Sequence, residues 1–234
     1  MNGHVSHRAR LVTVREIAPN IRHFVFNIAD VEQFNFVPGQ FLSFVSEVDG
    51  KPITRAYSIV SVPSGNQVEI CLNLVDDGHL SPRLFAMLPG DEKEVKGPYG
   101  GFIFREKRHT VCVATGTGIA PFRGMLQQRV PEDPQHEYTL LFGVRHEHGL
   151  LYREEWERMA DEHSNFRFVP TLTRPPENWS GRTGRVQPLI LETVGDRRDW
   201  AVYICGLKEM VDDVRSRLKE MGFDRKQIVF EKYD

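Results

Sequence analysis

A short apolar segment that continues into a glycine-rich turn constrains the fold of this chain more than any other feature. Residues 111–114 (VCVA) are typical of a buried parallel strand, and the turn at residues 115–118 (TGTG) follows directly. Pro121 then suits the first turn of a helix, where its missing N–H has no partner to lose. N–H groups at such a helix start attract phosphate. The segment predicts a site for a nucleotide pyrophosphate, although a plain turn between a core strand and a core helix fits the same pattern.

The first hundred residues have the pattern of an antiparallel β-structure. Short segments rich in β-branched and aromatic residues are separated by turn-forming pairs such as Pro38-Gly39 and Asp49-Gly50, which predicts a small β-barrel. We expect one inserted helix at about residues 81–87, with Pro82 in its first turn and Ser81 as its cap. The expected strands cover residues 10–17, 21–28, 41–45, 56–60 and 67–75.

After the Gly-rich segment at residues 97–101 the pattern changes, because strand-like and helical segments begin to alternate. Such alternation predicts βαβ units and a parallel sheet. The segments cover residues 110–114, 120–129, 137–144, 150–162, 166–172, 186–193, 202–205 and 208–221. The fold class is therefore a two-domain protein. We expect the N-terminal antiparallel barrel at residues 1–105 and the α/β parallel-sheet domain at residues 106–234.

Composition excludes several classes of protein. A formal net charge of −2 over 234 residues gives no general reason to expect nucleic acid as a partner. The 3 cysteines have no C-x-x-C spacing, which argues against a disulfide framework, a zinc ribbon or an iron–sulfur cluster formed by this chain alone, so no metal is expected. No apolar segment approaches the roughly 20 residues of a membrane span, and the N-terminal residues have no apolar signal core. We expect a cytoplasmic protein without a membrane span.

Four further stretches carry residue types suited to a cofactor site, although each also has an ordinary structural interpretation. Residues 55–58 (RAYS) place an arginine beside an aromatic ring, and residues 78–84 (GHLSPRL) form a glycine turn before a helix. Residues 203–210 (YICGLKEM) form a strand that ends in Cys-Gly, at the sheet edge where α/β proteins bind ligands. The last stretch, residues 229–234 (VFEKYD), combines a carboxylate with an aromatic ring, although a chain end usually frays.

Taken in this order and spacing, these stretches resemble the ferredoxin–NADP reductase family, whose flavoproteins have an FAD-binding barrel and an NAD(P)-binding α/β domain. RAYS resembles the family's Arg-x-Tyr-Ser flavin motif, and GHLSPRL resembles its pyrophosphate motif in the form seen in bacterial members. ATGTGIAPFR, LLYREEWERM and YICGLKEM are similar to plant-type members. The resemblance covers nearly the whole chain.

The resemblance implies an FAD site in the barrel. Arg55 would neutralise the FAD pyrophosphate, Tyr57 would pack on the isoalloxazine, and Ser58 would hydrogen-bond near flavin N5. The backbone of the pyrophosphate motif would assist Arg55, and two leucines would lie along the cofactor. The remaining implied FAD-binding residues are Ala56, Leu72, Leu74, Gly78, His79, Leu80 and Ser81.

The resemblance also implies a nicotinamide site in the α/β domain. Cys205 would lie beside the nicotinamide, Glu231 would support proton or charge balance, and Tyr233 would stack on the flavin face that nicotinamide must occupy. Together with Ser58 these are the implied catalytic residues. Plant-type members end on this tyrosine, whereas Asp234 follows it here. The residues implied to bind the nucleotide are Thr115, Gly116, Thr117, Gly118, Cys205, Gly206 and Tyr233.

Arginines near the ends of the next strands favour NADP(H) over NAD(H). An NAD site usually presents an acidic residue to the ribose, whereas guanidinium groups accommodate a 2′-phosphate. In the family a Ser-Arg pair and a later Arg and Tyr read that phosphate; this chain has Thr173-Arg174 and Arg182, but Gly184 in place of the Tyr. A solvated basic rim is the alternative interpretation. The candidate residues are Arg145, Arg174, Arg182 and Arg185.

Because the chain has no cluster of its own, we expect electrons to leave to a separate carrier protein, either ferredoxin or flavodoxin. Scattered basic residues of the barrel are a candidate docking surface for an acidic partner. Alternative functions are the reductase component of an oxygenase, a flavin reductase, or an electron-transfer subunit that does not turn over alone. The candidate docking residues are Arg8, Arg10, Lys51, Arg83, Lys93 and Lys96.

Overall fold

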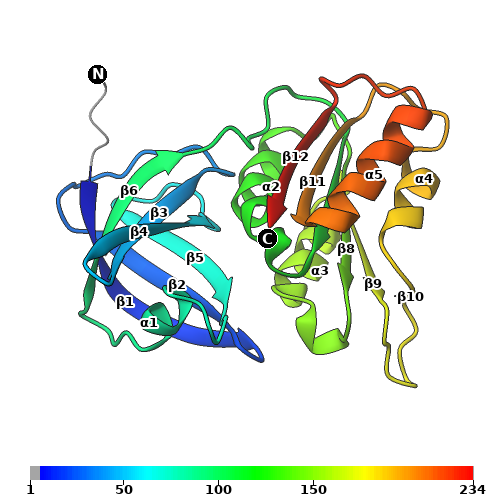
Figure 1. Ribbon diagram of the computed structural model, residues 1–234. Helices are drawn as coiled ribbons and strands as arrows, with labels where there is room; N and C mark the ends of the chain where they lie inside the picture. The colour runs from blue at the N-terminus through cyan, green and yellow to red at the C-terminus, as the bar shows by residue number, and fades with distance from the viewer. Residues whose placement is uncertain (1–5, 234) are drawn as a thin grey trace. The chain divides into compact units, whose positions relative to one another are not determined.

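The computed structural model describes residues 6–233 and divides them into two units (Figure 1). The first unit contains the described residues up to Ile103 together with Ala120–Met125. The second contains Phe104–Ile119 and the residues from Leu126 onward. The helix α2 (Ala120–Glu132) is therefore divided between the units. The division after Ile103 lies close to the boundary expected after residue 105, and the limits of the domains stay a prediction.

The first unit is built on a six-stranded sheet with the order β4-β3-β6-β1-β2-β5. Every strand pair in it is antiparallel. An isolated bridge between Ile59, just after β4, and Ile70 of β5 joins the two edges of this sheet. The predicted small barrel is thus confirmed. The strands are β1 (Ser6–Ala18), β2 (Ile21–Ile28), β3 (Phe41–Val48), β4 (Lys51–Ser58), β5 (Gln67–Asn73) and β6 (Glu92–Tyr99).

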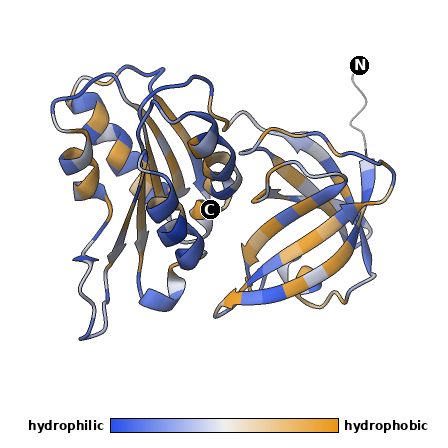
Figure 2. Ribbon diagram, turned by 180° about the vertical axis from the view of Figure 1, so that it is seen from behind, coloured by the Kyte–Doolittle hydropathy of each residue, from blue (hydrophilic) through white to orange (hydrophobic). Residues whose placement is uncertain are grey.

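Alternation of side chains along the strands explains why the sheet closes around one core. In β2, Phe24, Phe26 and Ile28 are fully buried in the barrel core, whereas His23 and Val25 lie on the opposite face. Figure 2 shows the resulting alternation of apolar and polar residues along the barrel strands. The period of two in the sequence therefore sets which residues form the core.

The helix α1 (Ser81–Phe85) forms where expected, but its cap differs from the prediction. Pro82 lies in the first turn, whereas the N-cap residue is Leu80 and no side chain caps the helix. The Ser81 hydroxyl accepts a hydrogen bond from the N–H of Val75 at 3.0 Å and donates to the carbonyl of Val75 at 3.3 Å. The expectation of a Ser81 cap is therefore wrong, because this side chain fastens the preceding loop instead.

The second unit is built on a six-stranded parallel sheet with the order β10-β9-β8-β7-β11-β12, and helices alternate with its strands as expected. One face packs on α4 and α5 through a core that includes Val111, Ile204 and Val214. The predicted fold class is confirmed. The strands are β7 (Thr110–Thr115), β8 (Tyr138–Val144), β9 (Phe166–Leu172), β10 (Arg182–Thr183), β11 (Ala201–Leu207) and β12 (Ile228–Tyr233). The remaining helices are η1 (Gly116–Ile119), η2 (Glu147–Gly149), α3 (Arg153–Glu162), α4 (Gln187–Val194) and α5 (Lys208–Glu220).

The end of the chain differs from the expectation of a frayed segment, because Ile228–Tyr233 forms the edge strand β12 beside β11. Asp234, which follows it, lies outside the described residues. Across residues 6–233, none of the helices has the length and apolar character that crossing a membrane requires.

Candidate functional site

The glycine-rich turn has the strand–turn–helix geometry that the sequence predicts. The strand β7 ends at Thr115, the short 3-10 helix η1 covers the turn, and α2 begins at Ala120 with Pro121 in its first turn. Gly116 has φ +54°, a backbone conformation that residues with a Cβ rarely adopt. The turn thus leaves the carboxyl end of the sheet, the edge at which parallel sheets bind ligands.

The turn packs tightly against the end of β11. A Cβ atom added to Gly118 would overlap with the carbonyl of Cys205, and one added to Gly206 would overlap with the Thr115 hydroxyl. Gly206 also has φ +147°. Two glycines therefore allow the turn and the Cys205-Gly206 segment to approach more closely than any other residue would permit.

The Thr115 hydroxyl is buried and makes no hydrogen bond within the part of the chain that the structure describes. A buried hydroxyl without a partner is costly, because it has lost its hydrogen bonds to water. This orphaned group, beside a cradle of glycine backbone, fits a ligand that brings polar atoms to the turn, as a nucleotide pyrophosphate would.

Cys205, Glu231 and Tyr233 meet where β11 pairs with β12. Cys205 is fully buried, lies opposite Glu231 in the register of the two strands, and shares a hydrogen bond with Tyr233. Burial, followed by the negative charge of Glu231, holds the pKa of the Cys205 thiol well above its ordinary value. Burial alone raises the pKa of the half-buried Glu231 carboxyl. The site therefore offers an uncharged thiol next to a carboxyl that keeps its proton to a higher pH than usual.

Two of the predicted arginines lie on neighbouring loops. Arg145 follows β8, Arg174 follows β9, and the N–H of Arg174 donates to the carbonyl of Arg145 at 2.8 Å. The Thr171 hydroxyl donates to the carbonyl of Gly184 at 2.9 Å, which holds the residue before Arg185 against β9. All three guanidinium groups are exposed and form no ion pair with any described residue. They are therefore available to an anion at the carboxyl ends of the strands.

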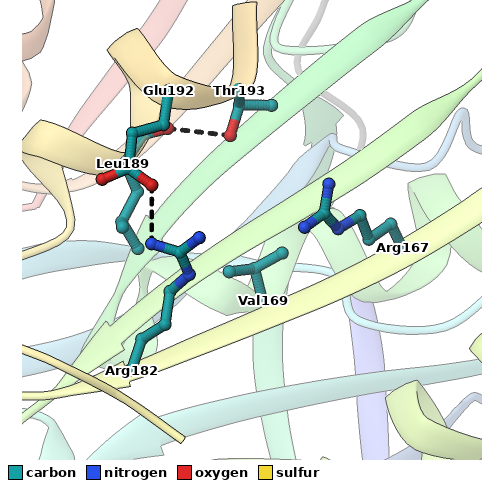
Figure 3. Close-up of a pocket in the computed structure, with 6 residues that line it drawn as sticks. All are labelled: Arg167, Val169, Arg182, Leu189, Glu192 and Thr193. Atoms are coloured by element: carbon teal, nitrogen blue, oxygen red, sulfur yellow. Dashed lines mark hydrogen bonds and ion pairs between the residues drawn. The ribbon is translucent and has the colours of Figure 1, made fainter.

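Arg182 occupies a different environment from the other predicted arginines. It lines a pocket of about 130 Å³ between β9 and α4, where it forms an ion pair with Glu192 at 2.6 Å (Figure 3). Arg167 and Val169 of β9 and Leu189 of α4 line the same pocket. The Arg182 side chain thus already has a carboxylate partner among the described residues, unlike the other three arginines.

In the barrel, the predicted flavin motif spans the end of β4. The Arg55 side chain is exposed, and its Nη1 donates to the carbonyl of Thr54 at 2.9 Å without an acidic partner among the described residues. Tyr57 is half-buried against Phe44, with ring centroids 5.7 Å apart, and burial raises its pKa to about 12. Ala56 is exposed and Ser58 is buried. An uncompensated guanidinium near a partly accessible aromatic ring fits the pyrophosphate and the ring system of a flavin.

The predicted pyrophosphate loop folds back on itself. The N–H of Gly78 donates to the carbonyl of Val75 at 2.8 Å, and Ser81 fastens the same residue as described above. His79 is exposed, whereas Leu80 is buried. Leu72 packs inside the barrel core with 2% of its surface exposed, while Leu74 is half-buried. Of the two leucines, only Leu74 offers its side chain to a molecule outside the core.

Most of the candidate docking residues of the barrel already have partners. Arg8 pairs with Asp30 and Glu92, Arg10 pairs with Glu92, and Lys96 pairs with Glu94. Arg83 donates to Ser46 Oγ at 2.5 Å and to the carbonyl of Glu47 at 2.6 Å. Lys51 and Lys93 form no ion pair within residues 6–233. These paired side chains make the surface less basic than their number in the sequence indicates.

Two family models match the chain in successive segments. Residues 8–104 match the oxidoreductase FAD-binding domain, and residues 112–216 match the oxidoreductase NAD-binding domain.

Comparison with known proteins finds similarity along almost the whole chain. Ferredoxin–NADP reductase B of Sorangium cellulosum is 37% identical over 97% of this chain and 97% of its own. The electron transfer component of toluate 1,2-dioxygenase from Pseudomonas putida is 28% identical over 97% of this chain and 67% of its own. The crystal structure of a ferredoxin NADP+ reductase from Neisseria gonorrhoeae with bound FAD and NADP matches with a TM-score of 0.82, 27% identity, and coverage of 97% of this chain and 98% of that one.

Proposed function

The chain belongs to the oxidoreductase family that combines an FAD-binding and an NAD-binding domain. We propose that it passes electrons between NADP(H) and a one-electron carrier protein through FAD. The observation that carries this proposal is the turn at residues 115–118, packed against Cys205-Gly206 with its buried Thr115 hydroxyl unpaired. The full-length similarity to a ferredoxin–NADP reductase supports it.

The residues of the barrel would bind FAD and orient its ring system. Arg55, which has no carboxylate partner among the described residues, would bind the pyrophosphate by charge-assisted hydrogen bonds. Tyr57 would pack on the ring system, and Ser58 would donate a hydrogen bond near the reacting edge. Bound FAD supplies chemistry that the side chains lack, since it accepts two electrons as a hydride and releases them singly.

For the nicotinamide nucleotide, the α/β unit aligns the reacting carbon. The turn at residues 115–118 would hold the pyrophosphate, and the uncharged Cys205 thiol would lie beside the nicotinamide without adding charge to it. Glu231 would exchange a proton at this edge, because its pKa lies nearer the working range than that of an exposed carboxyl. Reacting atoms must approach to about 3–3.5 Å, so positioning is the main contribution of the protein.

We place the 2′-phosphate of NADP(H) at Arg174 and Arg185, with Arg145 on the adjacent loop. Their exposed guanidinium groups have no ion-pair partner among the described residues, whereas Arg182 is bound to Glu192. NADP(H) is therefore favoured over NAD(H) as the nucleotide.

An anaerobic spectroscopic experiment tests the function directly. We expect the purified protein, loaded with FAD, to be yellow and to bleach on addition of NADPH. A panel of ferredoxins and flavodoxins then identifies the carrier that reoxidises it. A yellow protein that neither NADPH nor NADH bleaches would contradict enzymatic turnover and favour an electron-transfer subunit.

The alternative function is the reductase component of an oxygenase, which the similarity to the toluate dioxygenase electron transfer component supports. Reoxidation by an oxygenase and not by ferredoxin or flavodoxin would favour this alternative, and reoxidation by free flavin alone would favour a flavin reductase. The cytoplasmic location stays a prediction.

A further inference from the structure

A cluster of polar and charged side chains is buried on the outer face of the barrel, opposite its apolar core. His23 of β2 and Glu69 of β5 project from this face, with His23 Nε2 3.3 Å from Glu69 Oε2. The His23 side chain is 4% exposed and that of Glu69 is 22% exposed. Such groups are rarely buried unless they are paired, so the cluster needs a structural or functional reason.

The third member of the cluster is Arg123, which lies in the part of α2 that belongs to the same unit as the barrel. Its Nη1 donates to Glu69 Oε2 at 2.9 Å and to the carbonyl of Val60 at 3.2 Å. The Arg123 side chain is 13% exposed. One guanidinium thus joins the helix both to a strand and to the segment that precedes it.

The surrounding backbone is fitted to this contact. A Cβ atom added to Gly124 would overlap with the carbonyl of Ser61, so the glycine lets α2 approach closely. The N–H of Glu69 donates to Ser61 Oγ at 3.2 Å, and the N–H of Val60 donates to the carbonyl of Glu69 at 2.8 Å. The start of α2, residues 60–61 and β5 therefore form one hydrogen-bonded assembly around Glu69.

The partners of Glu69 keep its carboxyl ionised to a lower pH than usual. Its hydrogen bond with His23, followed by the charge of Arg123, lowers the pKa of the carboxyl despite the opposing effect of burial. Apolar residues would cover the same face without the cost of desolvating charges. In this structure one guanidinium contacts both Glu69 and Val60, so the cluster ties the start of α2 to both segments.

We propose that Arg123, held by Glu69 and Val60, is a positioning residue for hydride transfer from the nucleotide. The phosphate-binding turn at residues 115–118 leads directly into α2, and Arg123 lies in the first turns of that helix. Fixing these turns fixes the point from which the nucleotide turn projects. This inference rests on the proposed function, since it concerns the rate of the same reaction.

Stopped-flow reduction of the FAD-loaded protein by NADPH tests the proposal in three variants. Arg123→Met removes both contacts, Glu69→Gln keeps the shape but removes the charge, and Arg123→Lys keeps the charge. We expect the limiting rate of flavin reduction to fall about tenfold in the first two variants and less in Arg123→Lys, because small misplacements have large effects on rate. The flavin spectrum and the affinity for FAD should not change.

Arg129→Met is the matched control. Arg129 lies on the same helix, is half-buried, and has its guanidinium 5.7 Å from the centroid of the Phe104 ring, but it does not contact Glu69. We expect its limiting rate to equal that of the wild type. If Arg123→Met fails to fold, Glu69→Gln and Arg123→Lys carry the test.

Two outcomes would overturn the proposal, and both differ from the result expected if the proposed function were wrong. Variants that bind FAD and are reduced at the wild-type limiting rate show that the cluster serves stability alone. A fall in the Arg129→Met variant equal to that in Arg123→Met shows a general effect of disturbing the helix. Failure of the proposed function would instead appear in the wild type, as absence of reduction by either nucleotide.

Discussion

At the scale of single residues, burial changes the acid–base behaviour of Glu231 at the candidate site. Its pKa is raised by burial from an ordinary value of 4.5, so the folded protein binds this proton more tightly than the unfolded chain does. The contribution of Glu231 to stability is therefore fully present below the ordinary pKa and is lost as the pH rises through the raised one.

Glu231→Gln keeps the shape of the side chain and removes the titration. We expect the variant to gain free energy of unfolding relative to the wild type between about pH 5 and about pH 8. Urea unfolding at both values measures the difference. A difference between the two proteins that does not change with pH would contradict the assigned shift.

The arginines at the strand ends give a second test at this scale. Arg174→Ala should lower kcat/KM for NADPH about tenfold or more, since a hydrogen bond to a charged group contributes about 1.5–3 kcal/mol. The value for NADH should stay unchanged, because NADH has no 2′-phosphate. Steady-state kinetics with both nucleotides measures this effect. Arg182→Ala serves as a comparison, because Arg182 already forms an ion pair with Glu192. Equal losses with NADPH and NADH would place the 2′-phosphate elsewhere.

At the scale of elements, the nucleotide turn depends on the lack of a side chain at Gly118. In Gly118→Ala the new methyl group would overlap with the carbonyl of Cys205, so the turn or β11 must move. We expect KM for NADPH to rise about tenfold, with a loss of about 1–3 kcal/mol in unfolding free energy. Gly101→Ala is the control, because a Cβ there meets no atom within 4 Å. A Gly118→Ala variant with normal KM would show that the close approach is not needed for binding.

Elements whose pattern is local could be predicted from the sequence, and those that depend on neighbours could not. The strand β7, its turn and the start of α2 follow from apolar residues, glycines and Pro121 that act within one segment. The strand β6 was missed because it is largely charged and only Val95 is buried. The strand β12 was missed because its half-buried residues become a strand only by pairing with β11.

The site shows the same contrast. The residue types in RAYS and TGTG indicate which ligands these motifs could bind, because the groups that would contact the ligand lie within each short motif. The partners of Arg182 and Arg123 could not be predicted, since Glu192 and Glu69 reach them only after the chain has folded. Glu69, which interrupts the apolar residues of β5, was an available signal for this cluster.

At the scale of the whole molecule, cofactor binding should couple to stability. A ligand at about 100 times its dissociation constant adds about 2.7 kcal/mol to the free energy of unfolding. We expect removal of FAD to lower the melting temperature, and Arg55→Ala to reduce the difference between the FAD-loaded and FAD-free proteins. Thermal unfolding with and without FAD measures this. Lys51 lies on the same strand and is also exposed, so Lys51→Ala should keep the full difference. An undiminished difference in Arg55→Ala would contradict the role of Arg55.

The division of α2 has a consequence for protein engineering. A barrel fragment that ends before the parallel sheet would lose Ala120–Met125, and Glu69 would lose its ion pair with Arg123. Chimeras that exchange halves with relatives must therefore transplant these six residues together with the barrel they fit. A crossover placed between the two family matches, at residues 104–112, would separate the barrel from these residues.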